Sequence, residues 1–258
     1  FKANYFRISS DNFKKNINDS IEILEEPFAG LPIISYLLCV KKLAKTKVIL
    51  DGSGLDEANC GYDKYRNLRK NNFLIAQDGS LSVRKNIIHS KLNNKFTQEK
   101  IYKPFKAKFK NEMFADIFFI KLPRALRFRD KLSMRYGKEI RPCFLDKKLI
   151  LTLLKLDYKF HYHKGFGKRI LRDTFEDEIS KKIAFTKKRN IQTPQSEWFR
   201  GEMLDWLNKF IKETDVWDRN WIDRAEFLKS FDLFKSKKIN NSFFIWKLIN
   251  LSIWSELN

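Results

Sequence analysis

The alternation of hydrophobic and polar positions predicts an α/β order at the start of the chain. Residues 4–9 alternate as a strand does, and Ser10 or Asp11 is then expected to cap a helix that runs to about Glu26. A second helix is expected to begin at Pro32, where proline suits the first turn. Residues 46–50, "TKVIL", are almost wholly apolar, which is typical of a strand covered on both faces of a parallel sheet. Strand, helix, helix, strand indicates an α/β fold.

Helical spacing dominates the rest of the chain. Residues 64–110 are polar and without strong periodicity, and "QDGS" predicts a turn there. Apolar residues then recur at helical intervals in five segments, 113–137, 146–157, 168–185, 196–213 and 224–236. The pattern therefore predicts a small α/β part over residues 1–66 and a mainly helical part over residues 67–258.

The composition is that of a folded protein in a reducing compartment. Hydrophobic residues make up 43% of the 258 residues, enough to bury a sizeable core. The longest apolar run, "LPIISYLLCV", is too short to cross a bilayer, and no signal peptide is visible, so a cytoplasmic protein without a membrane partner is expected. The few cysteines and histidines show no metal-ligand spacing; they are Cys39, Cys60, Cys143, His89, His161 and His163.

The charge is strongly positive, with a formal net charge of +21. Such a balance suits polyphosphate, nucleic acid or an anionic surface, although the basic residues are spread along the chain as in a general compositional bias. One hypothesis is a basic nucleic-acid-binding module without catalysis, in which the 24 Phe supply stacking surfaces. Nucleic acid is the less favoured partner, because aromatic residues fall at helical core spacing, as in "WFRGEMLDWLNKF".

A glycine-punctuated loop, "DGSGLDE", follows the apolar segment 46–50. Gly52 and Gly54 would let backbone N–H groups approach a phosphate closely, and Asp56 and Glu57 could hold Mg²⁺ on that phosphate. The alternative is a strand-to-helix turn with acids in the first helical turn, where the helix dipole favours them. Spacing alone leaves both interpretations open, and an EF-hand is excluded because Asp56 and Tyr62 stand where glycine and glutamate are needed.

Three further motifs accompany this loop in a fixed order. They are "EEPFAGLP" before it, then "RDKLSMRYGKEIRPCFLD", then "GKRILRDTFEDEISKKIAFTKKRNIQTPQSEWFRG". Together with "VILDGSGLDEANCGY", the chain resembles the C-terminal synthetase domain of glutamine-hydrolysing asparagine synthetases, from about residue 25 to residue 201. Each motif alone is modest, and their order and spacing give the resemblance its weight.

The resemblance implies a fold and a reaction. The fold would be a partial adenine-nucleotide α-hydrolase-like (HUP) parallel sheet followed by a mostly helical C-terminal part. The reaction would be ATP- and Mg²⁺-dependent adenylation of a carboxylate, aspartate or a related acid, with release of pyrophosphate. Ammonia from a glutaminase domain would then displace AMP, so ATP, the carboxylate and ammonia are the expected ligands.

The same resemblance implies roles for particular residues. The catalytic candidates are Lys168, Asp130 and Arg141. The nucleotide-binding candidates are Asp51, Gly52, Ser53, Gly54, Lys168 and Arg172, and the metal candidates are Asp56 and Glu57. In the family, the lysine that matches Lys168 contacts the phosphates of ATP. A positive charge there would offset the charge that develops on departing pyrophosphate.

The departures from the family pattern concern the acceptor and the completeness of the site. Asp51 stands where the family has serine, and Ser53 stands where it has an acid associated with forming the aspartyl-adenylate. A carboxylate other than aspartate is therefore an open alternative. The pyrophosphatase loop SGGxDS and an N-terminal cysteine nucleophile do not occur in this sequence and would be expected upstream of Phe1. The chain by itself is thus expected to lack synthetase and glutaminase activity.

Overall fold

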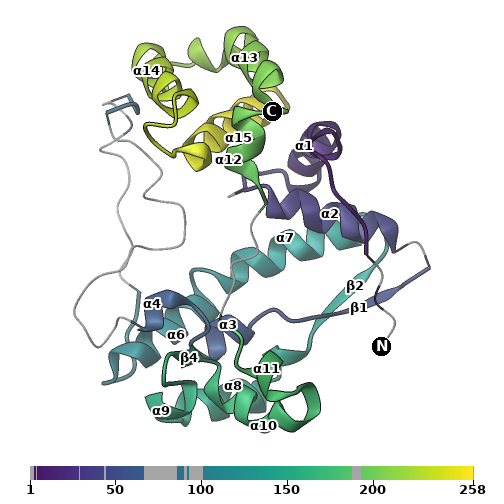
Figure 1. Ribbon diagram of the computed structural model, residues 1–258, viewed down its shortest axis with the longest axis vertical. Coiled ribbons are helices and arrows are strands. Elements are labelled where there is room, and N and C mark those ends of the chain that lie inside the picture. Colours follow the sequence, from purple (N-terminus) through teal and green to yellow (C-terminus); the bar gives the residue numbers. More distant parts are fainter. Residues whose placement is uncertain are drawn as a thin grey trace. The chain divides into compact units, whose positions relative to one another are not determined.

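The computed structural model describes residues 3, 5–28, 30–43, 45–66, 86–89, 92, 101–187 and 193–257 (Figure 1). The chain divides into two compact units, each built from segments that are distant in sequence. The first comprises Phe1–Ala44, Gln77–Gln98 and Ile191–Asn258, and the second comprises Lys45–Ala76 and Glu99–Asn190. These units do not follow the division at residue 66 expected from the sequence, because the N-terminal helices pack with C-terminal helices. The turn expected at "QDGS" lies outside the described residues.

The described part of the first unit is mainly helical. Its elements are α1 (Ser10–Leu24), α2 (Pro32–Lys42), α12 (Gln195–Arg200), α13 (Leu204–Glu213), the 3-10 helix η3 (Asp215–Trp217), α14 (Arg224–Lys235) and α15 (Ser242–Leu257). The helix α1 is confirmed, but it begins earlier than expected: the cap is Ser9, whose side chain exchanges hydrogen bonds with Asn12, and not Ser10 or Asp11. The strand expected over residues 4–9 is wrong, because residues 5–9 form no strand.

Aromatic side chains hold this unit together. The rings of Phe13 on α1 and Trp198 on α12 lie 4.8 Å apart between centroids. The indole N–H of Trp246 on α15 donates to the carbonyl of Phe28 at 3.0 Å. These contacts explain why α1 and α2 belong with the C-terminal helices: their apolar faces are buried there and not against a sheet.

The second unit combines a short sheet with helices. Its elements are β1 (Val48–Asp51), α3 (Leu55–Ala58), α4 (Asp63–Arg66), α6 (Lys108–Phe118), α7 (Leu122–Met134), β2 (Glu139–Pro142), η2 (Cys143–Leu145), α8 (Lys147–Lys155), α9 (Tyr158–His161), β3 (Tyr162–His163), β4 (Phe166–Gly167), α10 (Arg169–Ile179) and α11 (Lys181–Ala184). A buried cluster joins α3, α6 and α8, and Met113, Ile117 and Leu153 are among its members.

The sheet is smaller and more open than the sequence predicted. β1 pairs with β2 in parallel, with Val48 opposite Glu139 and Leu50 opposite Arg141 (Figure 1). The prediction that β1 is covered on both faces is wrong, because Val48 is 40% exposed and Leu50 is 72% exposed. A mixed, mostly helical α/β architecture is confirmed, whereas the described residues form only this two-stranded parallel sheet and not a larger HUP sheet. Among the described helices, none has the length and apolarity that crossing a membrane requires.

Candidate active site

The glycine-punctuated loop leaves the carboxyl end of β1, as predicted. Because β2 runs parallel to β1, this is also the carboxyl edge of the sheet. Gly54 has a φ of +91°, a left-handed conformation that glycine adopts without strain, and it begins α3. A Cβ atom on Gly54 would also overlap the side chain of Leu145. The turn therefore depends on glycine at this position.

The first residues of the loop bind one another. The carboxylate Oδ1 of Asp51 lies 2.8 Å from the guanidinium Nη1 of Arg129 on α7. The same oxygen accepts the backbone N–H of Ser53 at 2.8 Å, and it also accepts the Ser53 hydroxyl. The charge of Asp51 is thus offset inside the protein, and one backbone N–H of the loop is already used. Arg129 is the first residue of the "RDKLSMRYGKEIRPCFLD" motif, but the sequence did not mark it as a partner of the loop.

The structure brings Lys168 to the acidic end of the loop. Its ammonium Nζ lies 2.9 Å from Oδ1 of Asp56, and both side chains are mostly covered. Lys168 has a φ of +57° at the start of α10, and its backbone N–H donates to the carbonyl of Asn59 at 2.8 Å. Two candidates that the sequence supplied from separate motifs therefore form one ion pair.

Two glycines make this approach close. A Cβ atom on Gly61 would overlap Oδ1 of Asp56 and would lie 2.6 Å from Cε of Lys168. A Cβ atom on Gly167 would overlap the carbonyl oxygen of Cys60 and would lie 3.4 Å from Cα of Gly61. The segment that ends in Lys168 thus packs against the loop at backbone distance, which a larger side chain at either position would prevent.

A cavity of about 620 Å³ opens beside this contact. Its lining is rich in cationic side chains and contains one carboxylate, that of Asp63. The lining residues are Cys60, Gly61, Tyr62, Asp63, Tyr162, Lys164, Gly165, Phe166, Gly167, Lys168, Arg172, Ile183, Thr186 and Lys187. Among the described lining residues four are cations and one is an acid. Asp56, which pairs with Lys168, offsets one more positive charge, and the remaining balance favours an anionic ligand.

Arg172 lines the cavity and also braces it. Its Nε donates to the carbonyl of Gly167 at 2.7 Å, and its Nη1 donates to the carbonyls of Thr186 and Ala184, the former at 3.1 Å. Burial lowers the pKa of the Arg172 guanidinium, and the nearby charge of Arg169 lowers it further. The guanidinium remains charged at neutral pH, and part of its donor capacity fixes the end of α11.

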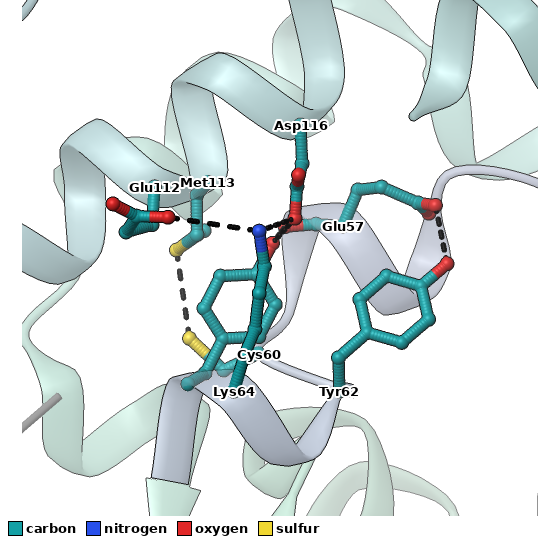
Figure 2. A network of polar contacts seen from close by, with 8 residues as sticks. Glu57, Cys60, Tyr62, Lys64, Glu112, Met113 and Asp116 are labelled. Carbon is teal, nitrogen blue, oxygen red and sulfur yellow. Dashed lines mark hydrogen bonds and ion pairs between the residues drawn. The ribbon is translucent and has the colours of Figure 1, made fainter. Parts of the chain in front are cut away.

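Glu57 points away from the ion pair and into the protein. Its side chain is buried and accepts the hydroxyl of Tyr62 at 2.5 Å (Figure 2). Burial, followed by the charge of Glu57, raises the pKa of Tyr62 well above its usual range, so the phenol stays a donor. The ammonium of Lys121 lies 3.9 Å from the centre of the Tyr62 ring. Glu57 is therefore a buried anchor for Tyr62.

A second polar network joins α4 and α6. The ammonium of Lys64 lies 2.6 Å from Asp116 and 3.6 Å from Glu112. Figure 2 draws both contacts as dashed lines. The hydroxyl of Tyr65 donates to Asp116 at 2.5 Å, and burial raises the pKa of Tyr65 well above its usual range. These contacts join α4 to α6 and thereby support the loop that precedes α4.

The geometry does not fit a magnesium site made by Asp56 and Glu57 together. The two residues are neighbours on α3, where successive side chains point about 100° apart. Asp56 is directed to Lys168, and Glu57 is directed to Tyr62. Among the described residues, no group of three or more His, Cys, Asp or Glu side chains is arranged to hold a metal ion. The two-carboxylate assignment is therefore not supported.

The remaining catalytic candidates lie apart from the cavity lining. Asp130 is exposed on α7, where its carbonyl accepts the hydroxyl of Ser133 at 3.1 Å. Arg141 on β2 is 60% exposed and grips Glu139 with two hydrogen bonds, of 3.0 and 3.1 Å. That pairing raises the pKa of Arg141. The catalytic roles of Asp130 and Arg141 stay predictions.

A buried polar pair escaped the sequence analysis. His161, at the end of α9, is fully buried, with its Nδ1 3.1 Å from the side chain of Asn59 and its Nε2 2.9 Å from the carbonyl of Leu153. Burial lowers the pKa of His161 to about 4, so the ring is neutral at physiological pH. Cys60, next in the chain to Asn59, is also buried, which raises the pKa of its thiol to about 12 and leaves it a poor nucleophile.

Comparison with known proteins supplies the family. A family model described as "Asparagine synthase" matches residues 2–256. A similar protein is "Asparagine synthetase (glutamine-hydrolyzing) 1" of Bacillus subtilis, which is 26% identical over 129 residues. The alignment covers 50% of this chain and 20% of that relative, so the chain spans only a minor part of the relative's length.

Proposed function

The chain belongs to the asparagine synthase family, and we propose that its second unit forms one wall of an ATP site in a carbon–nitrogen ligase. The observation that carries the proposal is the ion pair of Lys168 and Asp56, which lies after a parallel strand and beside a cationic cavity. Open α/β sheets bind ligands outside the carboxyl ends of their strands. Lys164, Arg172 and Lys187 add to the positive charge of that wall.

In the proposed reaction a substrate carboxylate oxygen attacks the α-phosphorus of ATP. The bond from that phosphorus to the bridging oxygen breaks, and pyrophosphate leaves with the electron pair. Lys168 offsets the charge that develops on the leaving oxygens, a contribution that is typically worth about 10²–10³ in rate for one preorganised donor. Ammonia then attacks the carbonyl carbon of the acyl-adenylate, AMP departs, and the nitrogen loses a proton to give the amide.

Asp56 has a positioning role in this proposal. An unpaired lysine side chain samples many rotamers, and ordering it reduces the favourable free energy of binding. The 2.9 Å contact with Asp56 holds the ammonium of Lys168 at the cavity wall before a ligand arrives. Because Glu57 is buried against Tyr62, no step is assigned to a magnesium ion held by that pair.

The acceptor is proposed to be a carboxylate other than aspartate. The loop carries Ser53 where the family has an acid, and Asp51, the acid two residues earlier, is already engaged by Arg129 and Ser53. The exchange therefore leaves the loop without a free carboxylate at its start. A substrate that lacks the amino group of aspartate would fit this change in charge.

A product assay tests the proposed function. The natural protein that carries this chain would be incubated with ATP, MgCl₂ and ammonium chloride, and with aspartate or other carboxylic acids one at a time. Equal amounts of AMP and pyrophosphate, formed only when a particular acid is present, are expected. Release of ADP, or AMP formation that does not depend on any acid, would contradict the assignment. Replacing ammonium by glutamine tests whether ammonia comes from a glutaminase domain.

A further inference from the structure

The segment before Lys168 is a tight hairpin that forms part of the cavity wall. β3 and β4 pair with Tyr162 opposite Gly167 and His163 opposite Phe166. The two-residue turn between them, Lys164–Gly165, has φ angles of +49° and +92°, as two-residue hairpin turns of the type I′ class require. Both turn residues line the cavity. So short a hairpin has little stability of its own and needs anchors at its ends.

Asn59 anchors both ends of this hairpin. Before the hairpin, the Asn59 side chain lies 3.1 Å from Nδ1 of His161. After the hairpin, the Asn59 carbonyl accepts the backbone N–H of Lys168 at 2.8 Å. Asn59 is 3% exposed and His161 is 0% exposed, so water cannot replace these bonds without opening the fold. One residue of the loop thus fixes the start and the end of the segment that delivers Lys168.

The hydrogen-bond chemistry assigns a direction to the pair. The carbonyl of Leu153 can only accept, so Nε2 of His161, at 2.9 Å, carries the ring proton. Burial lowers the pKa of His161 to about 4, which leaves Nδ1 without a proton at neutral pH. Oδ1 of Asn59 lies 3.1 Å from Nδ1 in the structure, but an oxygen cannot donate to this acceptor, so we assign the Asn59 amide with its –NH₂ turned toward Nδ1.

We propose that Asn59 and His161 are positioning residues that hold Lys168 at the cavity wall. The inference rests on the proposed function for the role of Lys168. The clamp, by which we mean the hydrogen bonds of Asn59 to His161 and to Lys168, stands on the contacts of Asn59 alone. The alternative is that the buried pair contributes only general stability to α9 and the loop. The two interpretations differ in whether loss of the bond between Asn59 and His161 loosens the backbone at Lys168 in particular.

Two substitutions of His161 separate the bonds. In His161→Asn, the side-chain oxygen takes the place of Nδ1 and can accept from Asn59, but the bond to Leu153 is lost. In His161→Gln, the side-chain amide takes the place of Nε2 and keeps the bond to Leu153, but the bond to Asn59 is lost. Asn is the smaller side chain, so packing alone predicts that His161→Asn is the more disruptive change. If the clamp holds Lys168, His161→Gln should disturb Lys168 more than His161→Asn does. Asn59→Leu removes the same bond from the other side.

Amide hydrogen exchange of the chain by NMR reads out this difference without any catalytic assay. The Lys168 amide should exchange about tenfold faster in His161→Gln and Asn59→Leu than in the wild type, because loss of one buried hydrogen bond eases local opening. His161→Asn should stay close to the wild type at Lys168. The Ile117 amide on α6, in the core of the same unit, should be unaffected in all three variants. A purely structural role would instead accelerate exchange at Lys168 and Ile117 together, and that result, or unchanged exchange at Lys168, would overturn the inference.

A titration with sodium pyrophosphate then links the clamp to the proposed function. His161→Gln should bind pyrophosphate about tenfold more weakly than His161→Asn, since the two differ in the one bond that orders Lys168. If His161→Gln and His161→Asn differ in exchange at Lys168 but bind pyrophosphate equally well, a positioning role in anion binding is overturned. If the wild type does not bind pyrophosphate although Lys168 exchange follows the prediction, the clamp is upheld and the proposed phosphate role of the cavity fails.

Discussion

Gly61→Ala should disturb the ion pair at the centre of the candidate site. A Cβ atom on Gly61 would overlap Oδ1 of Asp56, and it would lie 2.6 Å from Cε of Lys168 and 2.8 Å from Cα of Asp56. The first two neighbours belong to side chains, but the third is backbone. The Gly61 N–H also donates to the carbonyl of Asp56 at 2.8 Å. Relief of the clash therefore requires the turn itself to move, and Lys168 must move with it.

The expected magnitude follows from the kind of clash. Forcing a methyl group into a well-packed site typically lowers the free energy of unfolding by about 1–3 kcal/mol. A loss of about 2 kcal/mol corresponds to a fall in Tm of roughly 4–8 °C for a chain of this size. Gly52→Ala is the matched control for stability, because a Cβ atom on Gly52 meets no atom of the described residues within 4 Å. Its effect should stay within about 0.5 kcal/mol.

Thermal unfolding followed by circular dichroism measures the change in stability, and pyrophosphate titration of the folded variants measures the change in anion affinity. Gly61→Ala should lose both stability and affinity, whereas Gly52→Ala should keep its stability and serves as a control for unfolding alone, because Gly52 is itself a nucleotide-binding candidate. Equal Tm values for the two alanine variants would refute the close packing of Gly61 against Asp56 and Lys168.

Three further outcomes follow from other parts of the molecule. Arg129→Ala should lower the free energy of unfolding by about 1–3 kcal/mol in urea melts, because it leaves the mostly buried Asp51 carboxylate unpaired, and Arg129→Lys should lose less. Gly30→Ser should be more stable to heat than Gly30→Ala, because both amide atoms of Gln195 are buried and have no hydrogen-bond partner among the described residues, and Oε1 lies 3.8 Å from the added Cβ; equal Tm values would refute this. Because the pKa of His161 is lowered to about 4 in the fold, whereas an unperturbed histidine titrates near 6.5, its stabilising effect should be present above pH 6.5 and be lost as the pH falls toward 4. Urea melts at pH 7 and pH 5 should show this loss for the wild type, and the His161→Asn variant should lose less stability between the two pH values.

Much of the site was predictable because its signals are local. The loop after β1 is marked by glycines and acids, and its place at the carboxyl end of the strand is confirmed. The order of the motifs predicted a site to which both Asp56 and Lys168 contribute, and the structure places the two side chains in contact. Amphipathic spacing likewise located the helical regions, although it merged α6 with α7, α10 with α11 and α12 with α13, and it did not include α9.

Other features were missed for physical reasons. α15 is apolar on nearly all sides, so it has no helical period to detect, and β2, β3 and β4 are too short for alternation to be read. Asp56 and Glu57 look like a pair in the sequence, but a helix turns them apart. The bond between Asn59 and His161 joins residues that are distant in sequence, and no local pattern signals such a contact.

The aromatic residues show why composition alone was a weak guide. Phe13, Phe199 and Phe234 are 0% exposed, so they form core and do not offer a stacking surface. This agrees with the helical spacing of the aromatic residues, whereas Phe118 and Phe119 are 47% and 54% exposed, so the alternative of a nucleic-acid-binding module stays a prediction. The positive charge at the candidate site comes instead from the few cations that line its cavity.

ATP–pyrophosphate exchange by the natural protein that carries this chain tests the central proposal most directly, with Lys168→Ala compared with Lys148→Ala. Both variants lose one lysine from the second unit, but Lys148 is an exposed residue of α8 that does not line the cavity. Lys168→Ala should slow exchange by at least about 10²-fold while the fold is retained, because it removes one charged stabiliser of the departing pyrophosphate. Lys148→Ala should exchange at the wild-type rate. Exchange by Lys168→Ala at the rate of Lys148→Ala would contradict the proposal that this cavity wall acts on the phosphates of ATP.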